Sequence, residues 1–313
     1  MTKIAFQFPG QGSQKVGMGK DWAEAHDAAR RAFEEADDAL SFHLTRLCWE
    51  GPESDLQLTT NTQPSILACS VAILRVVREA GLQPVVAAGH SLGEYSALVA
   101  AEALSFVDAL RLVRSRGQFM QEAVPVGEGA MAAMIGPDEA AVRQIAEDAS
   151  AGDDDLCRVA NFNSPQQTVV SGHQGAVERA VELAKERGAK KAKLLPVSAP
   201  FHSPLMRPAR ERLEPLLAET TFASPAVPVV TNIDATPAAD GDAARDALVR
   251  QVDGPVRWVE SVGWMVQEAG AETFVEVGPG KVLTGLGRRI EREATWAALT
   301  DPKALDKLLT QLS

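Results

Sequence analysis

One stretch decides the fold of this 313-residue chain: Val85-Val86-Ala87-Ala88-Gly89-His90-Ser91-Leu92-Gly93. It joins a short apolar run, typical of a buried strand, to a helix-like segment at 94–100 through the pattern Gly-x-Ser-x-Gly. A serine on such a tight turn needs neighbours without bulk, and Gly89 and Gly93 provide them. A helix starting at Ser91 would direct N–H groups toward negative charge there. The pattern predicts a nucleophile elbow; a plain strand-to-helix turn is the alternative that five residues leave open.

Strands and helices alternate on both sides of this stretch. Short apolar runs predict buried strands at 4–8, 85–88, 228–231 and 274–277. Periodic apolar positions predict helices at 21–40, 64–80, 107–123 and 281–292, besides the helix after Ser91. This alternation indicates an α/β fold in which helices cover a mostly parallel sheet.

The pattern changes between residues 126 and 197. Strands at 130–135, 158–162, 168–171 and 192–197 and helices at 137–149 and 175–188 follow the order β-α-β-β-α-β. That order is typical of a ferredoxin-like unit. We therefore expect a large subdomain of residues 1–125 and 198–313 and an inserted small subdomain of residues 126–197. Inserted domains create clefts, and clefts bind ligands.

Composition narrows the class of protein. The 31 basic and 42 acidic residues give a net charge of −11, which argues against non-specific nucleic-acid binding. The three cysteines, Cys48, Cys69 and Cys157, are too far apart for a disulfide framework or a metal site. The longest apolar stretch is too short to span a bilayer, and the N-terminus lacks a signal-peptide pattern. We expect a cytoplasmic, monomeric protein with no bound metal, membrane segment or nucleic-acid partner.

A serine nucleophile needs a base, and the chain has five histidines. We expect His26, His43 and His173 to be structural, and His90 to point away from its neighbour Ser91. His202 remains, in a loop that Pro200 and Pro204 stiffen. A structural role for His202 is the alternative.

Two further features bear on chemistry. The loop Phe8-Pro9-Gly10-Gln11-Gly12-Ser13-Gln14 fits neither the dinucleotide fingerprint nor the P-loop pattern, because Lys15 and Met18 stand at required positions. It can present an N–H group near Ser91 or be a plain turn. Arg116 interrupts the apolar stripe of the helix at 107–123, so it needs a buried partner. That partner is either a structural carboxylate or the carboxylate of a substrate.

Together these residues give the chain a resemblance to malonyl-CoA:acyl carrier protein transacylases of type II fatty-acid synthesis. The resemblance covers essentially the whole chain. The motifs that carry it are Phe8–Gln14, Gln63-Pro64, Gly89-His90-Ser91-Leu92-Gly93-Glu94, Arg116, Asn161-Phe162-Asn163-Ser164-Pro165, His202 and the segment Val275–Leu283.

The resemblance implies a fold, a reaction and roles for these residues. The fold is an α/β-hydrolase-like large subdomain with an inserted ferredoxin-like one. Ser91 attacks the malonyl thioester of coenzyme A, and His202, oriented by the main-chain carbonyl of Gln251, takes its proton. The N–H groups of Gln11 and Leu92 hold the oxyanion. The residues implied to bind substrate are Arg116, which holds the malonyl carboxylate, and Gln63, His90, Asn161 and Phe201.

The resemblance also implies partners. An acyl carrier protein accepts the malonyl group on its phosphopantetheine thiol, coenzyme A enters as part of a substrate, and no cofactor is needed. Phe201 is typical of malonyl rather than methylmalonyl selectivity, because its ring fills the space of an α-methyl group. Carrier proteins of this type are acidic, so a basic surface is expected here. Two clusters qualify: Lys185, Arg187, Lys190, Lys191 and Lys193, or Arg207, Arg210 and Arg212.

Three other functions remain open. A serine hydrolase such as a thioesterase shares the Gly-x-Ser-x-Gly pattern, although the His-Gly-Gly motif of many lipases is absent from this sequence. An acyltransferase of a polyketide pathway shares all the motifs. A non-catalytic scaffold of the same fold has no need of Ser91, His202 and Arg116 together.

Overall fold

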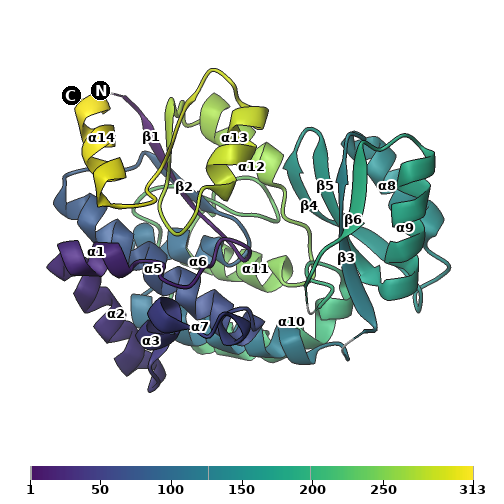
Figure 1. The fold of residues 1–313 in the computed structure, drawn as a ribbon, viewed down its shortest axis with the longest axis horizontal. Helices are drawn as coiled ribbons and strands as arrows, with labels where there is room; N and C mark the ends of the chain where they lie inside the picture. The colour runs from purple at the N-terminus through teal and green to yellow at the C-terminus, as the bar shows by residue number, and fades with distance from the viewer. Residues whose placement is uncertain (1, 126, 198, 313) are drawn as a thin grey trace.

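The computed structural model describes residues 2–125, 127–197 and 199–312, and it contains two separate sheets (Figure 1). The larger sheet has five parallel strands in the order β7-β2-β1-β8-β9. Their bounds are Ile4–Phe8 for β1, Val86–Gly89 for β2, Val229–Val230 for β7, Thr273–Glu276 for β8 and Thr295–Ala298 for β9. The predicted parallel sheet is confirmed.

Helices cover both faces of this sheet. N-terminal to the small sheet they are α1 (Lys20–Ala25), α2 (Asp27–Leu40), α3 (Leu44–Glu50), α4 (Glu53–Leu56), α5 (Thr59–Glu79), α6 (Gly93–Ala100) and α7 (Phe106–Glu122). C-terminal to it they are the 3-10 turn η1 (Pro204–Met206), α10 (Arg207–Glu219), α11 (Gly241–Gln251), α12 (Trp258–Gln267), α13 (Val282–Ile290) and α14 (Pro302–Leu312).

Alternate residues of the central strands point into two different cores. Phe6 and Phe8 of β1 join the core that contains the buried faces of α2, α5 and α7. Ala5 of the same strand joins the core formed with α12 and α13. Since both faces are covered, all residues of β1 and β2 are buried, which explains why these strands are apolar apart from the buried Gln7.

The smaller sheet is antiparallel, with the strand order β4-β5-β3-β6. Along the chain, the elements of this sheet and its two helices are β3 (Gly129–Ile135), α8 (Glu139–Ala149), β4 (Cys157–Ser164), β5 (Gln167–His173), α9 (Gln174–Glu186) and β6 (Lys191–Leu194). Ala132 and Met134 of β3 pack in a separate core with α8 and α9, whereas Met131 and Ala133 join the main core. One face of the small sheet is therefore covered by its own helices, and the other faces the large subdomain (Figure 1).

Three element predictions were wrong in detail. The helix expected at 21–40 is two helices, because His26 between them has an extended backbone. The helix α5 begins at Thr59, so Pro64 lies inside it rather than in its first turn. The helix after the elbow begins at Gly93 and not at Ser91, because Ser91 has a left-handed backbone with a φ of 54°.

The expected subdomain boundaries stay a prediction. Residues 126 and 198, at which the predicted segments 126–197 and 198–313 begin, lie outside the described residues, as do residues 1 and 313. Within the described residues, no helix combines the length and the apolar character that crossing a membrane requires.

Candidate active site

The turn between β2 and α6 has the geometry of a nucleophile elbow. Ser91 adopts a φ of 54°, a conformation that costs energy for a residue with a side chain. A Cβ added to Gly89 would lie 1.9 Å from the carbonyl group of Gly93, and one added to Gly93 would lie 2.1 Å from the carbonyl oxygen of Phe8. Neither position accepts a side chain, so the two glycines allow the serine to project from a tightly packed turn.

The His202 imidazole contacts the Ser91 hydroxyl. The distance from Ser91 Oγ to His202 Nε2 is 2.7 Å. The other ring nitrogen, Nδ1, lies 3.0 Å from the carbonyl oxygen of Gln251 and 3.1 Å from that of Gly254. Two carbonyl oxygens only accept hydrogen bonds, so Nδ1 carries the proton and Nε2 is left to accept one from the serine. The predicted main-chain contact to Gln251 is present.

The environment of His202 keeps its imidazole neutral. Burial, the nearby Arg116 guanidinium and the His90 ring lower its pKa to about 3, against the hydrogen bonds to the two carbonyl oxygens, which act to raise it. A neutral imidazole with a bare Nε2 is the form that a general base requires. His202 therefore has the protonation state of a base throughout the physiological pH range.

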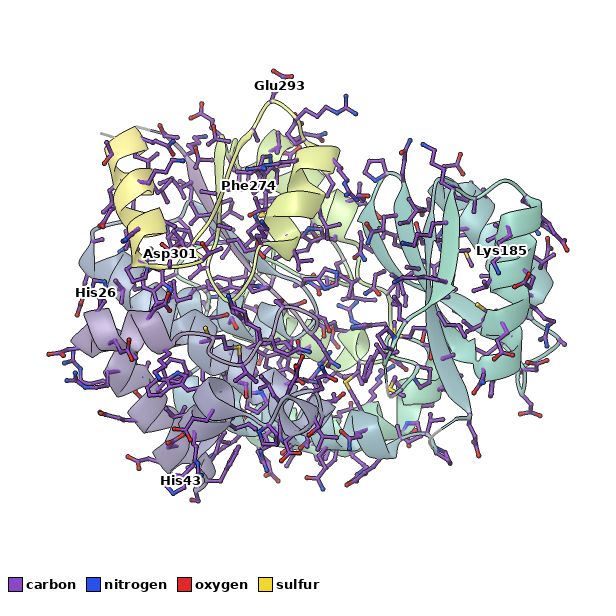
Figure 2. All side chains as sticks on the ribbon, viewed as in Figure 1. His26, His43, Lys185, Phe274, Glu293 and Asp301 are labelled. Carbon is purple, nitrogen blue, oxygen red and sulfur yellow. The ribbon has the colours of Figure 1, made fainter. Side chains whose placement is uncertain are left out.

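All five histidines lie in described parts of the chain, and the other four do not contact the Ser91 side chain. His26 and His43 lie at the periphery of the large subdomain (Figure 2), and the His43 side chain is 87% exposed. His173 accepts a hydrogen bond from the Leu156 N–H in the small subdomain. The His90 Nε2 atom lies 2.8 Å from Asn163 Oδ1, and burial lowers the pKa of this ring.

Arg116 is buried beside the serine. Its Nη1 donates to Gln63 Oε1 over 2.8 Å, and its Nη2 donates to Gln251 Oε1 over 2.9 Å and to Ser91 Oγ over 3.2 Å. Among the described residues, no carboxylate forms an ion pair with it, and its Nε has no acceptor. The structural carboxylate considered as its partner therefore does not contact it directly: two neutral amide oxygens and the serine hydroxyl accept its hydrogen bonds, and the buried Glu94 carboxylate acts on it only through its charge.

A buried carboxylate, that of Glu94, contacts Gln251, the residue that holds both Arg116 and His202. Glu94 Oε2 accepts hydrogen bonds of 2.8 Å from both Gln251 Nε2 and the backbone N–H of Asn232. Burial raises the pKa of Glu94 to about 7. Sequence reasoning gave no role to Asn232 or to the Glu94 carboxylate. A charged residue inside the apolar run after the elbow was the available signal for Glu94, whereas nothing local distinguishes Asn232.

A cavity of about 180 Å³ joins the two subdomains at Ser91. The predicted site residues that line it are Gln11, Gln63, His90, Ser91, Leu92, Arg116, Asn161, Phe201 and His202. Met131 and Val169 of the small sheet line it from the other side. Gln251 is the predicted residue that the cavity does not reach; it lies behind Arg116 and His202 and holds both.

Two N–H groups are available beside the serine. In the described part of the chain, the N–H groups of Gln11 and Leu92 have no hydrogen-bond acceptor. The Gln11 loop is pressed against the elbow, since a Cβ on Gly10 would lie 2.4 Å from the carbonyl oxygen of His90. The predicted oxyanion hole, with one donor from the residue after the serine and one from a neighbouring loop, stays a prediction that these two free N–H groups allow.

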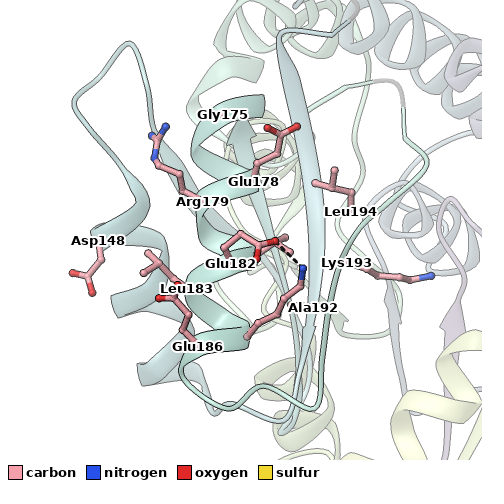
Figure 3. Close-up of a pocket in the computed structure, with 12 residues that line it drawn as sticks. Asp148, Gly175, Glu178, Arg179, Glu182, Leu183, Glu186, Ala192, Lys193 and Leu194 are labelled. Atoms are coloured by element: carbon pink, nitrogen blue, oxygen red, sulfur yellow. Dashed lines mark hydrogen bonds and ion pairs between the residues drawn. The ribbon is translucent and has the colours of Figure 1, made fainter.

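A larger hollow of about 1080 Å³ lies elsewhere, between α9 and β6 of the small subdomain (Figure 3). Its lining contains charged side chains such as Glu178, Glu182 and Lys193 and none of the predicted site residues. We take the smaller cavity as the candidate site, because Ser91, His202 and Arg116 meet there. In the described residues, no group of three or more His, Cys, Asp or Glu side chains is placed to hold a metal ion.

Comparison with known proteins agrees with this geometry. The sequence profile of the acyl transferase domain matches residues 5–299. The chain belongs to the acyl transferase family. Among its relatives, this acyl transferase is 51% identical over 306 residues to the malonyl CoA-acyl carrier protein transacylase of Escherichia coli K12, covering 97% of this chain and 98% of that one.

Solved structures of similar acyl transferases have the same fold. The malonyl CoA-acyl carrier protein transacylase of Coxiella burnetii is 45% identical and superimposes with a TM-score of 0.96, covering 99% of this chain and 98% of that one. A malonyl-transacylase in complex with its type II polyketide synthase acyl carrier protein is also 45% identical, with a TM-score of 0.96 and coverage of 99% and 100%. The predicted family and the predicted two-part α/β fold are confirmed.

Proposed function

We propose that this acyl transferase moves a malonyl group from coenzyme A to the phosphopantetheine thiol of an acyl carrier protein, with Ser91 as the nucleophile. One observation carries the proposal: the Ser91 hydroxyl lies within hydrogen-bond distance of both a neutral base, His202, and a buried cation, Arg116. The base activates a serine, and the cation suits an acyl group that itself bears a carboxylate. The names of the relatives support the same reaction.

The first half-reaction acylates the serine. Ser91 Oγ attacks the thioester carbonyl carbon while its proton passes to His202 Nε2. The N–H groups of Gln11 and Leu92 stabilise the oxyanion that forms. The carbon–sulfur bond then breaks, and the coenzyme A sulfur leaves with the proton from His202.

The second half-reaction reverses these roles. The thiol of the carrier protein gives its proton to His202, and its sulfur attacks the malonyl ester. The bond to Ser91 Oγ breaks, and the serine recovers its proton from His202. Side chains and N–H groups of the chain carry every step, so the proposed reaction uses no cofactor.

Arg116 binds the free malonyl carboxylate in this proposal. Gln63 and Gln251 fix its guanidinium, and the residue lines the cavity beside Ser91. The ring of Phe201, 9% exposed in the cavity wall, limits space for an α-methyl group. His90 and Asn161 line the same cavity and complete the substrate site.

The same proposal includes a monomeric state, a cytoplasmic location and an inserted small subdomain of residues 126–197. The pathway that the family resemblance implies is fatty-acid synthesis. A polyketide pathway is the second candidate, since one similar structure is a malonyl-transacylase bound to a type II polyketide synthase carrier protein.

Intact mass spectrometry after mixing with malonyl-CoA tests the proposal. We expect the wild-type chain to gain one malonyl group, Ser91→Ala to gain none, and peptide mapping to place the adduct on Ser91. A label on a buried thiol such as Cys69 would contradict it. Product analysis with carrier protein separates the hydrolase alternative, which releases free malonate instead of a malonyl thioester.

A further inference from the structure

Asn232 is buried beside the elbow, and both polar atoms of its side chain form hydrogen bonds with the backbone of the elbow. The residue lies just beyond β7 and is 0% exposed. Its Oδ1 accepts from the backbone N–H of Ser91 over 2.6 Å, and its Nδ2 donates to the carbonyl oxygen of Gly89 over 2.6 Å. A single carboxamide thus bridges the residue that ends the strand and the residue that carries the hydroxyl.

The backbone of Asn232 is itself held in place. Its N–H donates to Glu94 Oε2 over 2.8 Å, and its carbonyl oxygen accepts from the Arg257 N–H over 3.0 Å. Glu94 belongs to the helix that follows the elbow, so the bridge connects both ends of the turn to one buried carboxylate.

We propose that Asn232 is a positioning residue that keeps Ser91 in its strained, reactive conformation. The left-handed backbone of Ser91 places its N–H outside both the sheet and the helix, so that this partly buried donor is satisfied by a side-chain acceptor. The Asn232 carboxamide supplies the acceptor and anchors the turn to Gly89. Without it, the turn can relax and the hydroxyl loses its alignment with His202.

The same contact determines which donors face the oxyanion. Since the Ser91 N–H is bound to Asn232, it is turned away from the reacting carbonyl group. The donors that remain are the N–H groups of Leu92 and Gln11, as in the proposed mechanism. Asn232 touches no substrate in this arrangement and acts through Ser91.

This inference rests on the proposed function, because it takes Ser91 as the nucleophile. Its test is the rate of acylation at saturating malonyl-CoA, measured by rapid quenching and intact mass. Asn232→Ala removes both hydrogen bonds, and Asn232→Leu removes them while keeping the branched shape of the side chain. We expect each to acylate roughly 10- to 100-fold more slowly, with little change in half-saturating malonyl-CoA, the effect of losing one or two buried hydrogen bonds that hold a reacting group.

Thr231→Val is the matched control. Thr231 is buried next to Asn232, and its hydroxyl donates to the carbonyl oxygen of Thr236 rather than to the elbow. We expect this variant to lower the melting temperature and to leave the acylation rate unchanged. Wild-type rates in both Asn232 variants, or rates that fall in Thr231→Val in step with its melting temperature, would overturn the inference.

A second probe keeps the inference testable if the proposed function fails. A fluorophosphonate labels an activated serine regardless of its natural acyl group. If the wild-type chain takes up no malonyl group but its Ser91 is labelled, the Asn232 variants should label at least tenfold more slowly than Thr231→Val. Equal labelling rates would overturn the positioning role by itself.

Discussion

Ser91 and His202 both have a left-handed backbone, with φ of 54° and 56°, and their side chains meet at 2.7 Å. Such conformations are unfavourable for residues with side chains and persist only where the surroundings hold them. Asn232 holds the serine, and carbonyl oxygens of Gln251 and Gly254 hold the histidine. Four segments far apart in sequence therefore fix one hydrogen bond.

His202 is expected to be the base for acylation. His202→Ala should slow malonyl transfer to Ser91 by about a hundred-fold to ten-thousand-fold, the usual contribution of a positioned general base. Rapid-quench intact mass measures the rate. His173→Ala is the control, because His173 contacts Leu156 in the small subdomain. A severe loss in His173→Ala with a mild one in His202→Ala would show that the base is assigned wrongly.

The pH dependence of the same reaction follows from the pKa of His202. Because that pKa is lowered to about 3, protonation does not remove the base until the pH falls well below 5. We expect the wild-type acylation rate to lack a step at the ordinary histidine pKa of about 6.5 and to fall as the pH approaches 3. A midpoint near 6.5, absent from His202→Ala, would contradict the lowered pKa.

Glu94 should make the stability of the fold depend on pH. Its pKa rises from 4.5 to about 7 on folding, so the native state binds the proton more tightly than the unfolded state. The stability linked to this proton is complete below pH 4.5 and is lost as the pH rises through 7. In Glu94→Gln this loss is absent, so its free energy of unfolding relative to the wild type should increase between pH 5 and pH 8.

Urea unfolding at several pH values measures this difference. Glu214→Gln removes an exposed carboxylate from α10 and serves as the control, for which we expect no such trend. A constant difference between Glu94→Gln and the wild type from pH 5 to pH 8 would mean that Glu94 is ionised in the native state throughout.

Arg116 should set the choice between malonyl and acetyl groups. Arg116→Ala removes the cation for a carboxylate that malonyl has and acetyl lacks, so kcat/KM for malonyl-CoA should fall at least a hundred-fold more than that for acetyl-CoA. Arg114→Ala is the control, since Arg114 lies on the same helix but contacts Asn61 and the Phe42 ring. Equal losses for both thioesters would make Arg116 a structural residue.

The sequence predicted those strands and turns whose cause lies within a few neighbouring residues. Apolar runs such as 4–8 indicate buried strands, and the glycines on either side of Ser91 indicate a tight turn. The strands and the elbow lie at the predicted positions. The edge strand β9 was missed, because its burial depends on Trp296 stacking on Phe274 at 4.2 Å between ring centroids. The break at His26 was missed as well, because the apolar periodicity continues across it.

The same distinction applies to the site. Ser91, His202 and Arg116 were identified because each is unusual in its local context. Asn232 and the side chain of Gln251 act across sequence separations of 141 and 160 residues from Ser91, and no local pattern records such contacts. Only the folded chain brings Asn232 and the side chain of Gln251 next to Ser91.

The surface beside β6 is the better candidate for docking an acidic carrier protein. Within the described residues, Lys190, Lys191 and Lys193 form no ion pair, whereas Lys185 pairs with Glu182 and Arg187 pairs with Asp148. In the rival cluster, Arg210 and Arg212 pair with Asp253 and Glu122. The chain runs from β6 into the loop whose Leu195, Val197 and Phe201 line the cavity, so a partner on β6 lies close to Ser91.

Charge reversal tests this surface. Lys190→Glu with Lys191→Glu should raise KM for the carrier protein roughly three- to tenfold, since exposed charge contacts contribute about 0.2–1 kcal/mol each, and should flatten its salt dependence. Acylation by malonyl-CoA should change little. Lys303→Glu with Lys307→Glu makes the same change in net charge on α14, at the opposite end of the molecule (Figure 1). If both double variants raise KM equally, the carrier protein responds to overall charge and β6 is not its docking site.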